Sequence, residues 1–272
     1  MLRIGWFSTA RGESSKKLLD TVVSVIRKGG LDARIEFVFC SREPGESEKT
    51  DTFLAQVKEY HIPLVTFSVK KFARSFQQQV GVKDEELPGW RLEYDRRVMA
   101  KLEGFKVDLC LLAGYMLIVG HEMCGRFNMI NLHPALPGGP RGTWQEVIWQ
   151  LMGERAAESG VMIHLVTPQL DRGPVISFCS YPIRGGKFDA LWDELGDLPV
   201  DEVRQAEGEG NGLFKMIRQS GFMRETPLII HTLRSFSQGR IKIDNRKRLL
   251  DNRGSPISGY DLTAEIDREI VE

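Results

Sequence analysis

The chain has 272 residues, of which 42% are hydrophobic, and this is enough for one large domain with its own core. Lys and Arg number 37 and Asp and Glu also number 37, so the chain lacks the basic excess typical of nucleic-acid-binding domains. No apolar run approaches the roughly 18 residues that a membrane-spanning helix needs, and residues 1–15 lack the apolar core of a signal peptide.

The first third of the chain alternates strand and helix patterns. Short apolar runs at 2–7, 33–39 and 62–67 predict strands, and the stretches at 16–30 and 50–60 predict helices between them. A β-α-β-α-β order is the opening of a doubly wound parallel sheet.

The middle of the chain continues the alternation after a break. Residues 69–89 are polar and irregular and predict a mobile connection, whereas the apolar run at 107–116 predicts a strand buried on both faces. The other predicted elements are helices at 90–105, 121–126 and 145–154, a strand at 128–134 and a Gly/Pro-rich loop at 135–144.

The pattern changes in the second half. Strands at 160–167 and 173–183 flank the turn P-Q-L-D-R-G and are predicted to pair antiparallel. Residues 184–212 predict a Gly-rich, acidic surface excursion, 227–239 a final amphipathic helix and 240–250 a hairpin. The predicted fold class is therefore α/β, a Rossmann-like, mostly parallel sheet with an antiparallel edge.

The four cysteines favour a reduced protein. They are scattered and form no C-x-x-C pair, and Cys110 and Cys179 lie inside or beside apolar runs, as do reduced cysteines of a core. With Cys40 and Cys124, they indicate a cytoplasmic protein with no disulfide framework and no zinc site.

The segment I-N-L-H-P carries the first candidate site residues. Asn131 and His133 are two residues apart at the end of a predicted strand, so both side chains point to one side of it, where parallel α/β sheets bind ligands. An amide can stabilise an oxyanion and an imidazole can move a proton, as acyl transfer requires. The alternative is that His133 only makes a structural hydrogen bond.

A second segment, I-H-L-V-T-P-Q-L-D-R-G-P-V, supplies His164 and Asp171. A carboxylate in this turn can reach a neighbouring imidazole, hold its tautomer and raise its pKa. The alternative is that Asp171 only forms the turn before Gly173, because D-x-G is common in turns.

These two segments together resemble the folate-dependent formyltransferase family. The family pattern is N-I-H-P-S-L-L-P followed by T-x-H-x-V-x-x-x-x-D-x-G-P-I-I, and this chain has N-L-H-P-A-L-P and then I-H-L-V-T-P-Q-L-D-R-G-P-V-I. Upstream, R-L-E-Y-D-R and D-L-C-L-L-A-G-Y-M-L-I-V are similar to the family's R-E-x-Y-D-R and D-L-V-V-L-A-G-F-M-R-I-L. The resemblance covers residues 90–182 well and both ends loosely, including a similar tail at L-L-D-N-R-G-S-P-I-S-G-Y-D.

The resemblance implies a role for each candidate residue. His133 corresponds to the family's proton donor, Asn131 to the amide that steadies the reacting centre, and Asp171 to the acid that raises the pKa of the histidine. His164 corresponds to a family histidine near the site, for which a structural role stays open. The residues implied to bind folate are Arg91, through its side chain, and Met116, Leu117, Ile118 and Val119, through their main chain.

The activity implied is transfer of a formyl group from 10-formyltetrahydrofolate to the primary amine of glycinamide ribonucleotide, in purine biosynthesis, with no metal. Residues 1–272 are then expected to form one formyltransferase domain, with a Rossmann-like half at 1–120 and a catalytic, folate-binding half at 121–272. The expected partners are small-molecule substrates, with no nucleic acid and no membrane, and a homodimer is open.

Departures from the family pattern concern the acceptor more than the chemistry. The family's first loop, G-N-G-S-N, binds the substrate phosphate at a helix N-terminus, and this chain has T-A-R-G-E-S-S there. Gly12, Glu13 and Ser14 are the predicted substrate-binding residues, although Glu13 would repel a phosphate if it pointed inward. Leu117 stands where the family has arginine, and 183–221 is longer than its family equivalent.

Three alternatives remain at this point. The first is a formyltransferase for another amine, such as a nucleotide-linked amino sugar or methionyl-tRNA; the tRNA enzymes add a C-terminal barrel, for which the chain after Gly239 is too short. The second is a formyltetrahydrofolate hydrolase, whose usual N-terminal regulatory domain is not expected because the first strand begins at Leu2. The third is a non-catalytic folate- or nucleotide-binding module, which has no need of a proton shuttle.

Overall fold

The fold is built on one large sheet, seen in a computed structural model that describes residues 1–79 and 89–271. The strand order is β10-β7-β6-β5-β4-β1-β2-β3, and its pairs are parallel except for β5 with β6 and β6 with β7. The strands are β1 Leu2–Ser8, β2 Ala33–Cys40, β3 Leu64–Thr66, β4 Leu109–Leu112, β5 Met129–His133, β6 Glu158–Leu165, β7 Val175–Pro182 and β10 Tyr260–Asp261. The predicted α/β class, mostly parallel with an antiparallel part, is confirmed, and β10 adds a parallel edge beyond β7.

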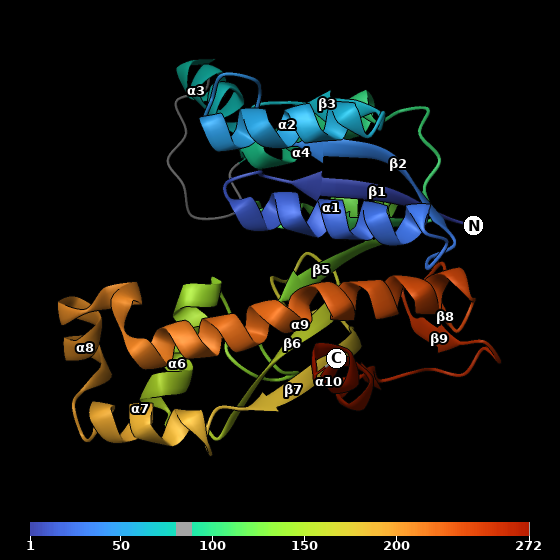
Figure 1. Cartoon of the computed structure of the whole chain (residues 1–272). Coiled ribbons are helices and arrows are strands. Elements are labelled where there is room, and N and C mark those ends of the chain that lie inside the picture. The colour runs from blue at the N-terminus through green and yellow to red at the C-terminus, as the bar shows by residue number, and fades with distance from the viewer. Residues whose placement is uncertain (80–88, 272) are drawn as a thin grey trace.

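Helices cover both faces of the sheet, and the long helix α9 crosses the lower part of the molecule in Figure 1. The helices are α1 Glu13–Arg27, α2 Glu48–Glu59, α3 Val69–Gln79, α4 Gly89–Lys101, α5 His121–Arg126, α6 Trp144–Gly153, α7 Lys187–Leu195, α8 Val200–Ala206, α9 Gly212–Ser237, α10 Thr263–Val271 and the short 3-10 helix η1 Gly208–Gly210. A separate hairpin pairs β8 Ile241–Ile243 with β9 Leu249–Asp251, as predicted for 240–250.

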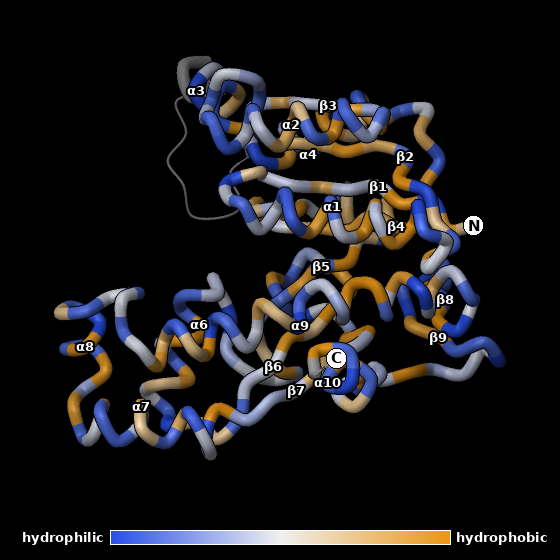
Figure 2. Tube along the Cα trace, viewed as in Figure 1, coloured by the Kyte–Doolittle hydropathy of each residue, from blue (hydrophilic) through white to orange (hydrophobic). Residues whose placement is uncertain are grey.

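The core lies in two layers, one on each face of the sheet. On one face, Ile4 and Trp6 of β1 join a hydrophobic cluster with residues of α1, α6 and α9, and on the other, Phe7 packs with residues of β2, α4 and α5. Hydrophobic residues accordingly run along the central strands in Figure 2. Burial on both faces explains why these strands are nearly continuous apolar runs.

Tertiary packing overrides several local predictions. Residues 69–79 form α3 rather than an irregular connection, while the rest of that predicted segment, 80–88, lies outside the described residues. The excursion at 184–212 is mostly helical, because α7, α8 and η1 occupy it. The predicted strand at 107–116 ends at Leu112, since Gly114 has a φ of 69° and turns the chain.

The final amphipathic helix is longer than predicted. Its pattern suggested a start at Pro227, a residue favoured in the first turn of helices, but α9 begins at Gly212, where the Asn211 side chain accepts a hydrogen bond from the Phe214 N–H. Pro227 is tolerated inside the helix because α9 packs along β6 and β7. The strand β10 and the helix α10 were not predicted.

All four cysteines are buried and unpaired. Within residues 1–79 and 89–271, no helix is both long and apolar enough to cross a membrane, and no group of three or more His, Cys, Asp or Glu side chains is arranged to hold a metal ion.

Candidate active site

The sheet order brings three separate segments to one edge. Strands β1, β4 and β5 are parallel neighbours, with Phe7 beside Leu112 and Leu112 beside Asn131. Strand β1 leads into residues 9–15, β4 leads into 113–119, and β5 ends with 131–133. These three segments therefore meet at the edge of the sheet formed by the carboxyl ends of the strands. These three segments contain the predicted phosphate loop, the predicted folate segment and the N-x-H pair.

Asn131 and His164 face each other across β5 and β6. The two residues are directly paired in the antiparallel register, so their side chains lie on one face, with Asn131 Nδ2 3.3 Å from His164 Nε2. His164 Nδ1 donates to the carbonyl oxygen of Leu165 at 3.1 Å, so Nε2 is the ring nitrogen that faces the candidate site.

His133 lies on the same face as Asn131 and is 2% exposed. Its Nε2 donates to the carbonyl oxygen of Pro140 at 2.9 Å, and its Nδ1 lies 3.7 Å from Asp171 Oδ2. Burial lowers the pKa of His133 below its ordinary value, while the Pro140 carbonyl and Asp171 act to raise it. The effect of Asp171 has the predicted sign, but burial outweighs it.

Asp171 connects the two histidines. Its Oδ1 lies 3.5 Å from His164 Nε2, and its side chain is 7% exposed. Burial by itself would raise the pKa of Asp171, but the hydrogen bond with His164 and the charge of His133 hold it below its ordinary value. The residue is therefore set to stay a carboxylate beside His133.

The main chain of the turn that carries Asp171 is tightly constrained. Asp171 has a φ of 50°, a region that few residues other than glycine adopt and that is found at functional sites. A Cβ on Gly173 would lie 1.6 Å from the carbonyl oxygen of Leu165, so only glycine fits there. The D-x-G segment is thus a turn, as one interpretation held, and it also places the carboxylate on the histidines.

The Gly/Pro-rich loop closes over His133 and Asp171. The Pro140 carbonyl accepts the hydrogen bond from His133, and the N–H of Gly142 helps to lower the pKa of Asp171. Gly142 has a φ of 102°, and the loop ends where Thr143 and Glu146 form a capping box at the start of α6. Sequence reasoning did not identify Pro140 and Gly142 as partners of the site, and the Gly/Pro composition was the only signal.

The predicted folate segment is open to solvent on one side. Met116 and Ile118 are 50% and 42% exposed. The N–H of Met116 donates to Thr9 Oγ1 at 2.9 Å, and the Ile118 carbonyl accepts from Arg91. Among the described residues, no partner is found for the N–H groups of Leu117, Ile118 and Val119 or for the carbonyls of Met116 and Leu117.

Arg91 is buried, at 5% exposure, under this segment. Its Nη2 donates to Asp95 Oδ1 at 3.0 Å and to the Ile118 carbonyl. Its Nη1 has no partner in the part of the chain that the structure describes, so the folate contact implied for Arg91 stays a prediction.

The predicted phosphate loop begins α1. Gly12 is the N-cap residue, Glu13 is exposed in the first turn and Ser14 is half-buried. Segment 9–15 contacts the chain just before the folate segment, because the N–H of Thr9 donates to the Gly114 carbonyl at 3.0 Å and a Cβ on Gly114 would lie 3.0 Å from Ser15 Oγ.

Known proteins match this chain over most of its length. Phosphoribosylglycinamide formyltransferase of Haemophilus influenzae is 26% identical over 89% of this chain and 92% of its own length. The enzyme of that name from Dictyostelium discoideum is 28% identical, covering 70% of this chain and 82% of its own. A solved Coxiella burnetii phosphoribosylglycinamide formyltransferase has the same fold, with a TM-score of 0.66 at 20% identity over 96% of this chain and 98% of that one.

The family model described as "Formyl transferase" matches residues 11–187, well over half of the chain. That span contains residues 11–15 of the predicted phosphate loop, the folate segment, β5 and the turn with Asp171. The chain therefore belongs to the formyl transferase family.

Proposed function

We propose that this enzyme transfers the formyl group of 10-formyltetrahydrofolate to the primary amine of glycinamide ribonucleotide, a step of purine biosynthesis. The observation that carries the proposal is the convergence of Asn131, His133 and Asp171, from β5 and a distant turn, beside the exposed segment 116–119. Relatives named phosphoribosylglycinamide formyltransferase, matched over most of their length, support the acceptor.

The residues of segment 116–119 fit a pterin. The edge of a pterin ring carries several hydrogen-bond donors and acceptors, and here main-chain N–H and C=O groups lack internal partners among the described residues. The half-exposed side chains of Met116 and Ile118 offer apolar contact to the ring faces. When bound, 10-formyltetrahydrofolate supplies the electrophilic formyl carbon.

His133 and Asn131 then act on the formyl group from one face of β5. The Asn131 amide donates to the formyl oxygen as negative charge develops there, and the His133 imidazolium, held by the Asp171 carboxylate, adds a second donor. The imidazolium gives its Nε2 proton to the leaving N10 as the C–N bond to N10 breaks, and the neutral imidazole then takes the proton that the amine loses on forming its new C–N bond. Because Nε2 donates to Pro140, the loop at 135–143 has to withdraw first.

Replacing Asp171 by asparagine is expected to shift the pH dependence of the rate. The Asp171 carboxylate raises the pKa of His133, so its removal lowers that pKa further. The imidazolium is lost as pH rises through this pKa, so the alkaline loss of kcat/KM moves to lower pH, while the folate KM stays nearly constant. Profiles between about pH 5 and 9 for Asp171→Asn and for the exposed control Asp197→Asn measure this. A full rate with an unmoved profile would mean that Asp171 only forms the turn.

Replacing Gly12 by valine is expected to raise the acceptor KM about tenfold or more, with the folate KM unchanged. A Cβ at Gly12 meets only Ser14 Oγ, at 3.9 Å, so the protein itself has room for the side chain. A phosphate bound at the N-terminus of α1 does not, because it approaches the main-chain N–H groups directly. Initial rates against acceptor concentration, with Gly210→Val as the control at another open glycine, measure the effect. An unaltered acceptor KM would place the phosphate elsewhere.

The test of the function itself is direct. Purified protein is mixed with 10-formyltetrahydrofolate and a panel of amines, and the absorbance of released tetrahydrofolate is followed together with formate. Rapid release only with glycinamide ribonucleotide is the expected result. Release with another amine would change the acceptor, and formate production without any amine would make the protein a hydrolase.

A further inference from the structure

A buried ion pair on α4 is attached to the folate segment. Arg91 and Asp95 lie one helical turn apart and are 5% and 1% exposed, with Arg91 Nη2 3.0 Å from Asp95 Oδ1. Arg91 Nη2 also donates to the Ile118 carbonyl, and Asp95 Oδ2 accepts from the N–H of Gly120 at 2.7 Å. The pair therefore holds the main chain at two points, 118 and 120.

A buried ion pair is an unfavourable way merely to pack α4 against its neighbours, in terms of free energy. Taking two charges out of water costs free energy that their attraction returns only when the geometry is good, and burial raises the pKa of Asp95 even with Arg91 beside it. The side chains around the ion pair leave no room for a side chain at position 120, because a Cβ on Gly120 would lie 2.7 Å from Leu92 Cδ2 and 3.0 Å from Asp95 Oδ2.

The segment 116–120 has no regular secondary structure, so its shape depends on these attachments. Thr9 holds the N–H of Met116, Arg91 holds the carbonyl of Ile118 and Asp95 holds the N–H of Gly120. The groups left without partners among the described residues, notably the N–H groups of Leu117 and Val119, lie between these points. The attachments thus use the groups that a ligand does not need.

We propose that Arg91 and Asp95 are positioning residues, which hold the main chain of 116–120 in the geometry that binds the folate co-substrate. The inference rests on the proposed function, because the ligand of this segment is the folate of that reaction. Asp95 thereby has a role in folate binding, and Arg91 acts mainly by holding the Ile118 carbonyl.

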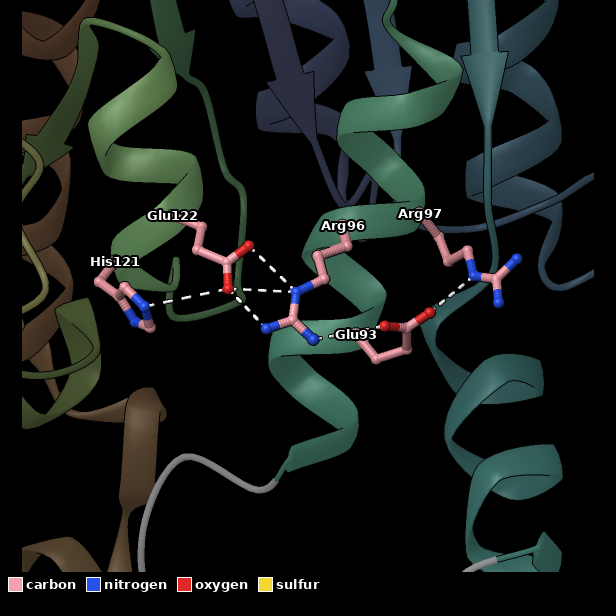
Figure 3. Close-up of polar contacts among 5 residues, drawn as sticks. All are labelled: Glu93, Arg96, Arg97, His121 and Glu122. Atoms are coloured by element: carbon pink, nitrogen blue, oxygen red, sulfur yellow. Dashed lines mark hydrogen bonds and ion pairs between the residues drawn. The ribbon is translucent and has the colours of Figure 1, made fainter.

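A surface network provides a matched control. Arg96, on the same helix, pairs with Glu122 of α5 at 2.6 Å and with Glu93, while Arg97 pairs with Glu93 and His121 lies near Glu122 (Figure 3). This network also joins α4 to α5, but its side chains are partly exposed, and none of its ion pairs among the described residues involves 116–119. If the buried pair served only to attach α4 to α5, breaking the buried pair and breaking the surface network would have the same kind of effect on the enzyme and would differ only in its size.

The experiment compares Asp95→Asn with Arg96→Gln. Asparagine has one side-chain oxygen for two donors, Arg91 Nη2 and the Gly120 N–H, so one of them faces an NH₂ group. We expect the folate KM to rise about 10-fold to 100-fold in Asp95→Asn, with kcat and the acceptor KM changed less than about threefold. In Arg96→Gln all three constants stay within about twofold.

Hydrogen exchange of the unliganded protein gives a readout independent of activity. The amide of Gly120, which Asp95 holds, is expected to exchange about tenfold faster in Asp95→Asn than in the wild type, with the amides of the sheet unchanged. If Asp95→Asn does not fold, Arg91→Lys replaces it, because lysine keeps the positive charge beside Asp95 but lacks the planar guanidinium whose Nη2 donates to both Asp95 and the Ile118 carbonyl. The same rise in folate KM is expected there.

The outcomes separate this inference from the proposed function. An active Asp95→Asn enzyme with the wild-type folate KM would overturn the inference, whether or not its exchange is faster, and would leave the function intact. An equal rise in folate KM in Arg96→Gln would also overturn it. A wild-type protein that transfers formyl to no amine would overturn the proposed function and the inference with it.

Discussion

Replacing His133 by asparagine is expected to lower kcat by about 10²–10⁴, the usual loss when a general acid or base is removed. His133 is 2% exposed, faces the Asp171 carboxylate with Nδ1 and can reach a substrate only through Nε2. Asparagine places its amide nitrogen near the position of Nδ1, so the contact with Asp171 is kept while the proton shuttle at Nε2 is lost. Folate binding is expected to remain, since segment 116–119 is unaltered.

Single-turnover rates and circular dichroism together measure this effect. The control is His121→Asn, the same change at a histidine whose side chain is 63% exposed, which is expected to keep the full rate. Transfer activity within a few-fold of wild type in His133→Asn would rule out the mechanism. Loss of folding in that variant would instead favour the interpretation that His133 only makes a structural hydrogen bond to Pro140.

Replacing Asn131 by alanine is expected to lower kcat by about 10²–10³, the range for loss of one preorganised oxyanion donor. The half-buried Asn131 amide lies beside His164 on the face that also carries His133, and it is the donor proposed for the charge that develops on the formyl oxygen. Alanine leaves His164 Nε2 with Asp171 as its neighbour, so the carboxylate stays in place.

The double variant Asn131→Ala/His133→Asn gives the sharper result. Both residues serve one transition state, so its loss of kcat is expected to be smaller than the product of the two single losses. Steady-state kinetics of the four proteins, with the exposed Asn252→Ala as a control, measure the coupling. Losses that multiply fully would mean that the two side chains act in separate steps.

Much of the fold followed from local pattern. The apolar runs of β1, β2 and β5 predicted strands because strands buried on both faces need apolar residues at nearly every position. The segment 160–183 predicted an antiparallel pair because its two runs flank a short turn, and β6 and β7 pair in this way. Where the pattern was ambiguous, as in α3 and α7, long-range packing decided the structure.

The sequence by itself determined the class of the sheet and the chemistry of its candidate residues, because periodicity and side-chain type are local properties. The order N-x-H-P and then D-x-G-P was enough to single out Asn131, His133 and Asp171. Only the tertiary structure decided that Asp171 meets both His133 and His164, that Pro140 occupies Nε2 of His133 and that Arg91 is buried with Asp95. These contacts join residues brought together by strand register, loop closure and helix packing, and no local pattern encodes a distance between them.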